Sequence, residues 1–288
     1  MPPTTPPAET PRLLQPPVAL TIGGSDSGGG AGIQADLKTF TALQVHGCSA
    51  ITCLTAQNTC GVERVDGLAA AALTAQVEAV CRDFAVAAVK TGMLLNAALI
   101  EATASAISRI AAPRVIDPVM VSRAGAVLLE PEAVAAMTAL LPLANLITPN
   151  VHEAGLLTGR QLTSPQEMED CARQLSQLGC RAVLIKGGGL AALQGRDLLC
   201  SDGQLEWLVS PAITTPHTHG SGCTLAAAIT AGLAQGLELR DSIVAAKVYL
   251  TGALRRGLAI GAGAGPLCHW HQALAPGGGT GSSPQTSP

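Results

Sequence analysis

The chain has 288 residues and a net charge of -3, and 48% of its residues are apolar, 13% charged and 2% aromatic. This apolar share is ordinary for a globular protein and excludes a disordered chain, and no apolar run reaches the roughly 18 residues of a membrane span. The 17 basic residues are scattered and outnumbered by 20 acidic ones. We therefore expect neither nucleic acid nor a membrane as a partner.

The two ends of the chain differ from the rest in composition. Residues 1–17 are rich in proline, and residues 275–288 are almost entirely small or polar. Neither end offers enough apolar surface to offset the entropy lost on ordering, so we predict a disordered tail at each end. Residues 18–274 contain no linker and no repeat, which predicts one domain between the tails.

Nine cysteines, an odd number, lie mostly inside apolar runs. No secretory signal precedes them, so buried free thiols in a reducing cytoplasm fit better than disulfides. A zinc cluster is the sharper alternative. However, the chain has no CxxC pair, and the histidines near Cys268 lack the paired spacing of a closed zinc site.

Short apolar runs alternate with longer segments of helical periodicity along the chain. The sequence predicts strands at 18–22, 49–54, 86–90, 114–116, 145–148 and 182–185, and a hairpin at 197–209 that turns at Asp202-Gly203. It predicts helices at 32–43, 73–83, 97–110, 131–141, 151–157, 165–178, 223–235 and 241–258. Strands that are apolar throughout and separated by helices indicate a parallel sheet covered on both faces. Ligands then bind beyond the carboxyl ends of the strands.

The first strand is followed by a segment with six glycines in ten residues, 23–32. Such a segment allows the backbone to come very close to a ligand. It matches neither the GxGxxG pattern nor the Walker motif. Asp36, in the helix that follows, either reaches the same pocket or only complements the helix dipole.

A second glycine-rich segment, 219–224, runs into a predicted helix. Gly220 and Gly222 leave free N–H groups at the helix start, which indicates an anion site. Cys223 lies in the first turn, where a thiol pKa is expected to fall to about 3.5–7.5. Ser221 lacks the flanking glycines of a nucleophile elbow. Two nearby histidines keep a cysteine hydrolase open as an alternative, but the anion site favours phosphoryl transfer.

Oxygen-bearing side chains follow two other predicted strands. Asp117 ends one of them, and Asn150 and Glu153 lie just beyond another. Three such ligands suit Mg²⁺, which takes few protein ligands and keeps several waters. Alternatively, Asn150 and Glu153 form a capping box at the start of the next helix, and the two roles are compatible.

Two of the four lysines also end apolar strands, Lys90 and Lys186. A lysine at such a position is more often functional than one on a helix surface. Lys186 is followed by three glycines, which makes it the stronger candidate for contact with a nucleotide phosphate.

Together these segments closely resemble the hydroxymethylpyrimidine/phosphomethylpyrimidine kinases of thiamine biosynthesis. The shared motifs are GGSDSGGGAGIQADLKTF (23–40), TAQNTCGV (55–62), KTGML (90–94), IDPVM (116–120), ITPNVHEA (147–154), LIKGGG (184–189), THGSGCT (218–224) and GAGPLCHWH (263–271). The resemblance implies a ribokinase-like fold, a three-layer α/β/α sandwich with a mostly parallel central sheet. It also implies a homodimer that uses ATP and Mg²⁺ to phosphorylate 4-amino-5-hydroxymethyl-2-methylpyrimidine to its monophosphate and then to the diphosphate.

The resemblance also assigns roles to individual residues. Gln57 is expected to hold the pyrimidine edge, since its amide both donates and accepts. Asp36 and Gly24 would flank the ring, and Met93 would pack on it.

For phosphoryl transfer, the resemblance implies an anion hole at Gly220–Cys223, including Ser221 and Gly222, with Cys223 as the general base. The remaining expected roles are Mg²⁺ binding through water by Asp117, Asn150 and Glu153, and nucleotide contact by Asn150, Lys186 and Thr218. Pro216-His217 departs from the family pattern, which commonly has a basic residue followed by asparagine, so the nucleotide contacts there stay open.

Two other functions are compatible with these motifs. A pyridoxal or pyridoxine kinase of the same fold would act on a similar ring with a similar hydroxymethyl arm. A non-catalytic pyrimidine-binding or sensor protein would keep the pocket without the chemistry, because fold alone does not imply activity.

Overall fold

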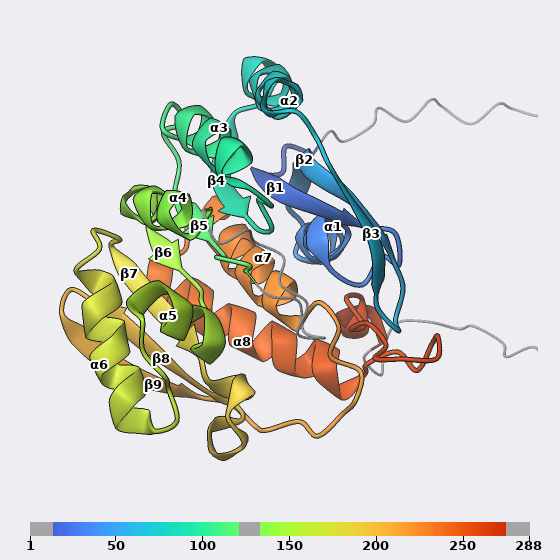
Figure 1. The fold of residues 1–288 in the computed structure, drawn as a ribbon. Helices are drawn as coiled ribbons and strands as arrows, with labels where there is room; N and C mark the ends of the chain where they lie inside the picture. The colour runs from blue at the N-terminus through green and yellow to red at the C-terminus, as the bar shows by residue number, and fades with distance from the viewer. Residues whose placement is uncertain (1–13, 121–132, 275–288) are drawn as a thin grey trace, which may run out of the picture.

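The computed structural model describes residues 14–120 and 133–274, which contain one nine-stranded sheet in the order β3-β2-β1-β4-β5-β6-β7-β8-β9 (Figure 1). The strands are β1 Val18–Asp26, β2 His46–Gln57, β3 Val62–Gly67, β4 Val86–Thr91, β5 Arg114–Ile116, β6 Leu146–Ile147, β7 Ala182–Lys186, β8 Arg196–Ser201 and β9 Gln204–Val209. The six strands from β2 to β7 in this order pair in parallel, and β3, β8 and β9 add antiparallel edges.

Helices cover both faces of the sheet (Figure 1). The first face carries α2 Ala70–Asp83, α3 Ala97–Ile107, α4 Ala133–Leu140, α5 Val151–Thr158 and α6 Pro165–Ser176, and the second carries α1 Gly32–Ala42, α7 Ser221–Ala234 and α8 Leu239–Arg255. Side chains of successive strand residues point to opposite faces. Val183 accordingly packs in the first core, and its neighbour Leu184 packs in the second.

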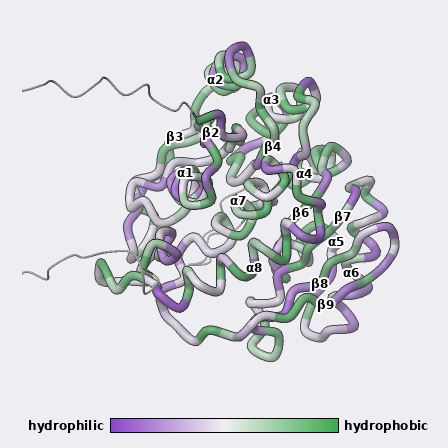
Figure 2. The backbone as a smooth tube through the Cα atoms, turned by 180° about the vertical axis from the view of Figure 1, so that it is seen from behind, coloured by the Kyte–Doolittle hydropathy of each residue, from purple (hydrophilic) through white to green (hydrophobic). Residues whose placement is uncertain are grey.

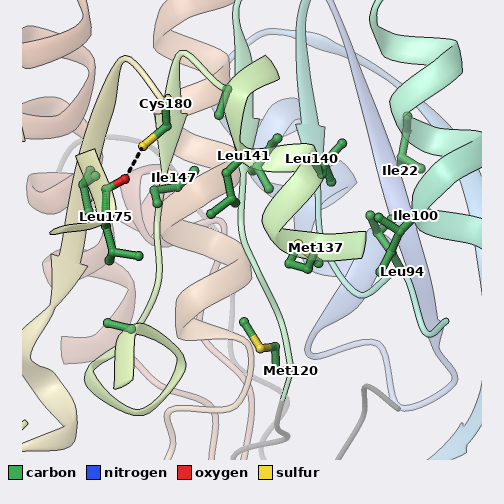
Figure 3. Packing of buried hydrophobic residues seen from close by; sticks show 14 of the residues in the cluster. Ile22, Leu94, Ile100, Met120, Met137, Leu140, Leu141, Ile147, Leu175 and Cys180 are labelled. Carbon is green, nitrogen blue, oxygen red and sulfur yellow. Dashed lines mark hydrogen bonds between the residues drawn. The ribbon is translucent and has the colours of Figure 1, made fainter. Parts of the chain in front are cut away.

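The first core is the larger of the two, and Figure 3 shows part of it, with Leu141 beside Ile147. In the second core, α7 lies in the middle of the molecule (Figure 2). Ten of its residues are buried, from Thr224 to Ala234. This burial fixes α7 tightly, and its first turn can therefore present backbone groups in a constant position.

The expected three-layer α/β/α sandwich with a mostly parallel sheet is confirmed. The hairpin turn is confirmed as well, because Asp202 and Gly203 have φ values of 50° and 75°, which a type I′ turn requires. No helix in the described parts of the chain is both long and apolar enough to cross a membrane.

Some element boundaries were wrong. β1 extends to Asp26, so the first part of the predicted glycine-rich loop is strand, with an irregularity between Gly23 and Ser25. Strand β3 was not predicted, because it lies at the sheet edge with mostly exposed side chains and lacks an apolar pattern. The predicted tails fall largely outside the described residues, as does the start of the helix predicted at 131–141.

Candidate active site

A cavity of about 950 Å³ opens at the carboxyl ends of the parallel strands and the start of α7. Every residue for which the sequence predicts a site role lies on its wall: Gly24, Asp36, Gln57, Met93, Asp117, Asn150, Glu153, Lys186, Thr218, Gly220, Ser221, Gly222 and Cys223. Segments far apart in the sequence therefore meet at this edge of the sheet, as the strand-end rule predicts.

The two glycine-rich segments contact each other directly. Gly220, the N-cap of α7, has a φ of 80°, and a Cβ atom on it would lie 1.9 Å from the carbonyl oxygen of Gly30. A Cβ atom on Gly30 would lie 2.4 Å from the His219 ring. Any side chain at either glycine would separate the two loops, so this contact explains why both are glycine.

Asp26 holds the first glycine-rich loop in shape. Its carboxylate accepts hydrogen bonds from the backbone N–H groups of Gly28, Gly30 and Ala31, at 2.8, 3.0 and 2.8 Å. His219 Nε2 lies 2.9 Å from the same carboxylate. Burial acts to raise the pKa of Asp26, but the hydrogen bonds from His219 and the loop outweigh burial and lower it. Asp26 was not predicted as a site residue. Its signal was an aspartate two residues before a glycine run, the pattern of a side chain that binds its own loop.

A buried ion pair lies in the wall of the cavity. Lys90 Nζ is 2.7 Å from Asp36 Oδ2, Thr21 Oγ1 donates to the same oxygen at 2.6 Å, and all three side chains are buried. Burial acts to lower the pKa of Lys90, but the Asp36 carboxylate outweighs burial and raises it. Asp36 Oδ1 has no hydrogen-bond partner among the described residues, so a ligand donor could bind there.

Asn150 and Glu153 form the capping box of α5. Asn150 Oδ1 accepts from the N–H groups of His152 and Glu153, both at 2.9 Å, and Glu153 Oε2 accepts from the Asn150 N–H at 2.8 Å. Both lone pairs of the Asn150 side-chain oxygen are engaged in this box, so a role of Asn150 in holding Mg²⁺ stays a prediction from the resemblance. Its Nδ2 group is not used by this box and stays open to a nucleotide.

Asp117 and Lys186 form a second ion pair beside the start of α7. Lys186 Nζ lies 2.9 Å from Asp117 Oδ1, and Thr148 Oγ1 donates to the same oxygen at 2.9 Å. Burial acts to lower the pKa of Lys186, but Asp117 and Glu153 outweigh burial and raise it. A Cβ atom on Gly222 would lie 3.3 Å from Lys186 Nζ. The lysine and the N–H groups at the start of α7 therefore face one region, which favours an anion.

Glu153 and Asp117 are both buried on the cavity wall. Burial raises the pKa of Glu153 to about 7, with Asp117 adding to the rise and Lys186 opposing it. No group of three or more His, Cys, Asp or Glu side chains in the described residues is arranged to hold a metal ion. Two carboxylates still fit Mg²⁺, which binds through few protein ligands and keeps its waters.

The Cys223 thiol is not activated in the way the sequence suggests. Burial raises its pKa to about 11, and the attraction of Lys90 only partly offsets burial and the repulsion from Asp36 and Asp117. The predicted fall in this pKa was wrong, because the helix dipole acts on a site that is removed from water and faces two carboxylates.

Two further wall residues were not predicted as site residues. Asp197 accepts a hydrogen bond from the Gly187 N–H at 3.0 Å and forms an ion pair with Lys247 of α8. This pair holds the backbone next to Lys186 in place. Lysine is rare in this chain, and all four lysines contact an oxygen of the cavity walls or the first glycine-rich loop: Lys38, Lys90, Lys186 and Lys247. This rarity was the available sequence signal.

The Glu153 carboxylate leads to a prediction about stability and metal dependence. In metal-free buffer, Glu153→Gln should stabilise the protein at pH 8 relative to wild type, by about 3 kcal/mol at most. The raised pKa means that the folded state holds a proton which the unfolded state has lost. Wild-type stability should therefore fall as the pH rises from 4.5 to about 7. Denaturant unfolding at pH 5 and pH 8 measures this.

Glutamine keeps the cap on Asn150, so the helix start should be unchanged. The Mg²⁺ concentration for half-maximal activity should rise in this variant, because one of the two carboxylates is gone. An unchanged Mg²⁺ dependence in this variant would show that Glu153 does not hold the metal and serves only as a cap.

A mostly parallel α/β/α sandwich, with a lysine and a helix N-terminus converging at its strand ends, defines a ribokinase-like kinase. The family model of phosphomethylpyrimidine kinase matches residues 26–268. The chain belongs to this family. It is 55% identical over 257 residues to the hydroxymethylpyrimidine/phosphomethylpyrimidine kinase of Synechococcus elongatus, covering 88% of this chain and 98% of that one.

Solved structures agree with this assignment. Bacillus subtilis pyridoxal kinase in complex with ADP superposes with a TM-score of 0.84 at 40% identity, covering 90% of this chain and all of that one. The phosphomethylpyrimidine kinase of Clostridium difficile gives a TM-score of 0.74 at 40% identity, covering 82% of this chain and 99% of that one. The fold is thus shared with kinases of two related ring substrates.

Proposed function

We propose that this protein uses ATP to phosphorylate 4-amino-5-hydroxymethyl-2-methylpyrimidine, and then phosphorylates the monophosphate to the diphosphate, supplying the pyrimidine half of thiamine. The main support for this proposal is that one cavity is lined by Gln57, by Lys186 and by the N-terminus of α7. A ring-recognising amide and an anion site within a single cavity suit the transfer of a phosphoryl group to an arm of that ring.

Each part of the wall has a role in this proposal. Gln57 binds the ring edge, Asp36 and Gly24 flank the ring, and Met93 packs on its face. In its thiolate form, Cys223 takes the proton from the hydroxymethyl group as the oxygen of that group attacks the γ-phosphorus of ATP. The bond from the γ-phosphorus to the bridging oxygen breaks, and ADP leaves. The N–H groups of the Gly220–Cys223 turn and the Lys186 ammonium stabilise the negative charge on the transferred group.

Asp117 and Glu153 would hold Mg²⁺ through water, and the ion would neutralise charge on the nucleotide phosphates. Lys186, Asn150 Nδ2 and Thr218 would contact the nucleotide. Thr218 Oγ1 is buried on the cavity wall without a hydrogen-bond partner among the described residues, which supports a ligand contact. His217, which departs from the family pattern, accepts the Gly265 N–H at 3.1 Å and so anchors a neighbouring loop.

A pyridoxal kinase is the second candidate, and the superposition on the Bacillus subtilis enzyme favours it. Comparing turnover of pyridoxal with turnover of the pyrimidine alcohol decides between the two, and we expect the pyrimidine to be preferred. A non-catalytic sensor is disfavoured, because Lys186, Asp117 and the α7 N-terminus are all in place for transfer.

We also propose that residues 18–274 act as one kinase domain in a cytoplasmic homodimer. The homodimer follows from the resemblance, and sedimentation of the full chain tests it. The cytoplasm is supported by the cysteines, because all nine are free thiols.

Gln57 leads to a prediction about ring binding. Gln57→Ala should weaken binding of the pyrimidine alcohol by about 1–3 kcal/mol, because polar groups of the ring lose their partners. The affinity for ATP should change little. Titration calorimetry with each ligand measures both, and equal losses for the two would mean that Gln57 supports the fold instead of the ring.

A further inference from the structure

The side chain of Gln57 is held between two residues that the proposed mechanism leaves unused. Gln57 Oε1 is placed 3.1 Å from Thr55 Oγ1, and Gln57 Nε2 is placed 3.4 Å from His219 Nε2. All three residues lie on the cavity wall. The oxygen and nitrogen of a glutamine amide exchange places by a half-turn, so the neighbouring groups determine which end is which.

Thr55 fixes the first end. Its hydroxyl lies 2.9 Å from the carbonyl oxygen of Ser25, which can only accept a hydrogen bond. The single hydroxyl proton is therefore used, and Thr55 Oγ1 has only a lone pair left for Gln57. The end of the amide that faces Thr55 must be the NH₂ group.

His219 fixes the second end. Its Nε2 lies 2.9 Å from Asp26 Oδ2, and this carboxylate also accepts the N–H groups of Gly30 and Ala31. The lowered pKa of Asp26 keeps the carboxylate ionised, so it can only accept, and His219 Nε2 donates its single proton to it. A protonated Nε2 has no lone pair left to accept the NH₂ group of Gln57, so the end of the amide that faces His219 must be the carbonyl oxygen.

We infer that Thr55 and His219 lock the Gln57 amide in one orientation and thereby set which ring edge the cavity accepts. This inference rests on the proposed function. The locked amide offers one N–H on the Thr55 side and one oxygen lone pair on the His219 side. A ring with an acceptor nitrogen beside an amino group fits, with its nitrogen toward Thr55 and its amino group toward His219.

A 4-oxo analogue of the ring distinguishes the two orientations of the Gln57 amide. The 4-amino pyrimidine alcohol presents an acceptor and then a donor, whereas its 4-oxo analogue presents an N–H donor and then a carbonyl acceptor. The analogue would match only an amide turned by a half-turn. In Thr55→Val and in His219→Phe, one of the two groups that prevent this rotation is removed.

The experiment measures dissociation constants of both pyrimidines by titration calorimetry, without ATP, together with kcat/KM for each. Wild type should prefer the 4-amino ring by tenfold or more, and each variant should lose about tenfold of that preference, close to one hydrogen bond. KM for ATP should stay unchanged. Thr103→Val is the matched control, because it removes a buried threonine hydroxyl that donates only to the Leu99 carbonyl oxygen in α3.

An unchanged preference in both variants would overturn the inference, whatever happens to the absolute rates. His219 also contacts the glycine-rich loop, so Thr55→Val provides the second, isosteric variant. A wild type that binds and discriminates the two rings without phosphorylating them would refute the proposed function but support the locked amide. Equal binding of both rings by wild type would refute the locked amide alone.

Discussion

Cys223→Ala should slow phosphorylation of the pyrimidine alcohol by about 10²–10⁴, as expected for loss of a general base, and should slow phosphorylation of the monophosphate far less. The alcohol must lose a proton to become a nucleophile. The monophosphate has a second pKa near 6 and is already largely deprotonated at pH 7, so it needs no base. Measuring the two half-reactions separately tests this difference.

Cys223→Asp should have the opposite pattern. A carboxylate can serve as a base for the alcohol, but it would face the incoming phosphate at close range. Two unit charges 4 Å apart repel by about 4 kcal/mol at an effective dielectric of 20. The first step should therefore survive and the second should slow. If alanine slows both steps by the same factor, Cys223 shapes the anion hole and is not the base.

The pH dependence provides an independent check on the same residue. With the pKa of Cys223 at about 11, the thiol form dominates at pH 7, and the thiolate fraction grows about tenfold per pH unit below that pKa. The kcat/KM of the first step should therefore rise between pH 7 and pH 9. The second step should stay nearly flat over this range, and the rise should vanish in Cys223→Ala.

Lys186→Met should reduce kcat by about 10²–10³ in both half-reactions, the usual effect of removing one charge-stabilising donor from a transition state. Both steps transfer the same phosphoryl group, so the loss should not distinguish the two acceptors. This separates Lys186 from Cys223. Single-turnover rates with each acceptor measure the effect.

The same variant leaves the buried carboxylates of Asp117 and Glu153 without their cation, so it should also be destabilised. The double variant Asp117→Asn with Lys186→Met removes one of those charges. It should recover stability in denaturant unfolding without recovering activity. Recovery of both would mean that Lys186 acts only by neutralising Asp117.

The sequence alone determined the layers of the fold and the place of the site. Apolar strands alternating with helices indicate a covered parallel sheet. The positions just after the strands indicated Asp117 and Lys186, and the glycine-rich helix start indicated the turn at 220–223. The roles of Gln57 and Met93 came only from the resemblance to the family. The capping box of Asn150 and Glu153 and the turn at Asp202-Gly203 were also readable, because each depends on residues only a few positions apart.

Only the tertiary structure decided what those residues can do. The Cys223 pKa depends on burial and on Asp36, Asp117 and Lys90, which lie more than a hundred residues away in the sequence. The pairing of His219 with Asp26 also depends on the tertiary structure, because the two residues are 193 positions apart in the sequence. Desolvation and charge act over distances in space, and a local pattern carries no information on which distant groups the fold places together.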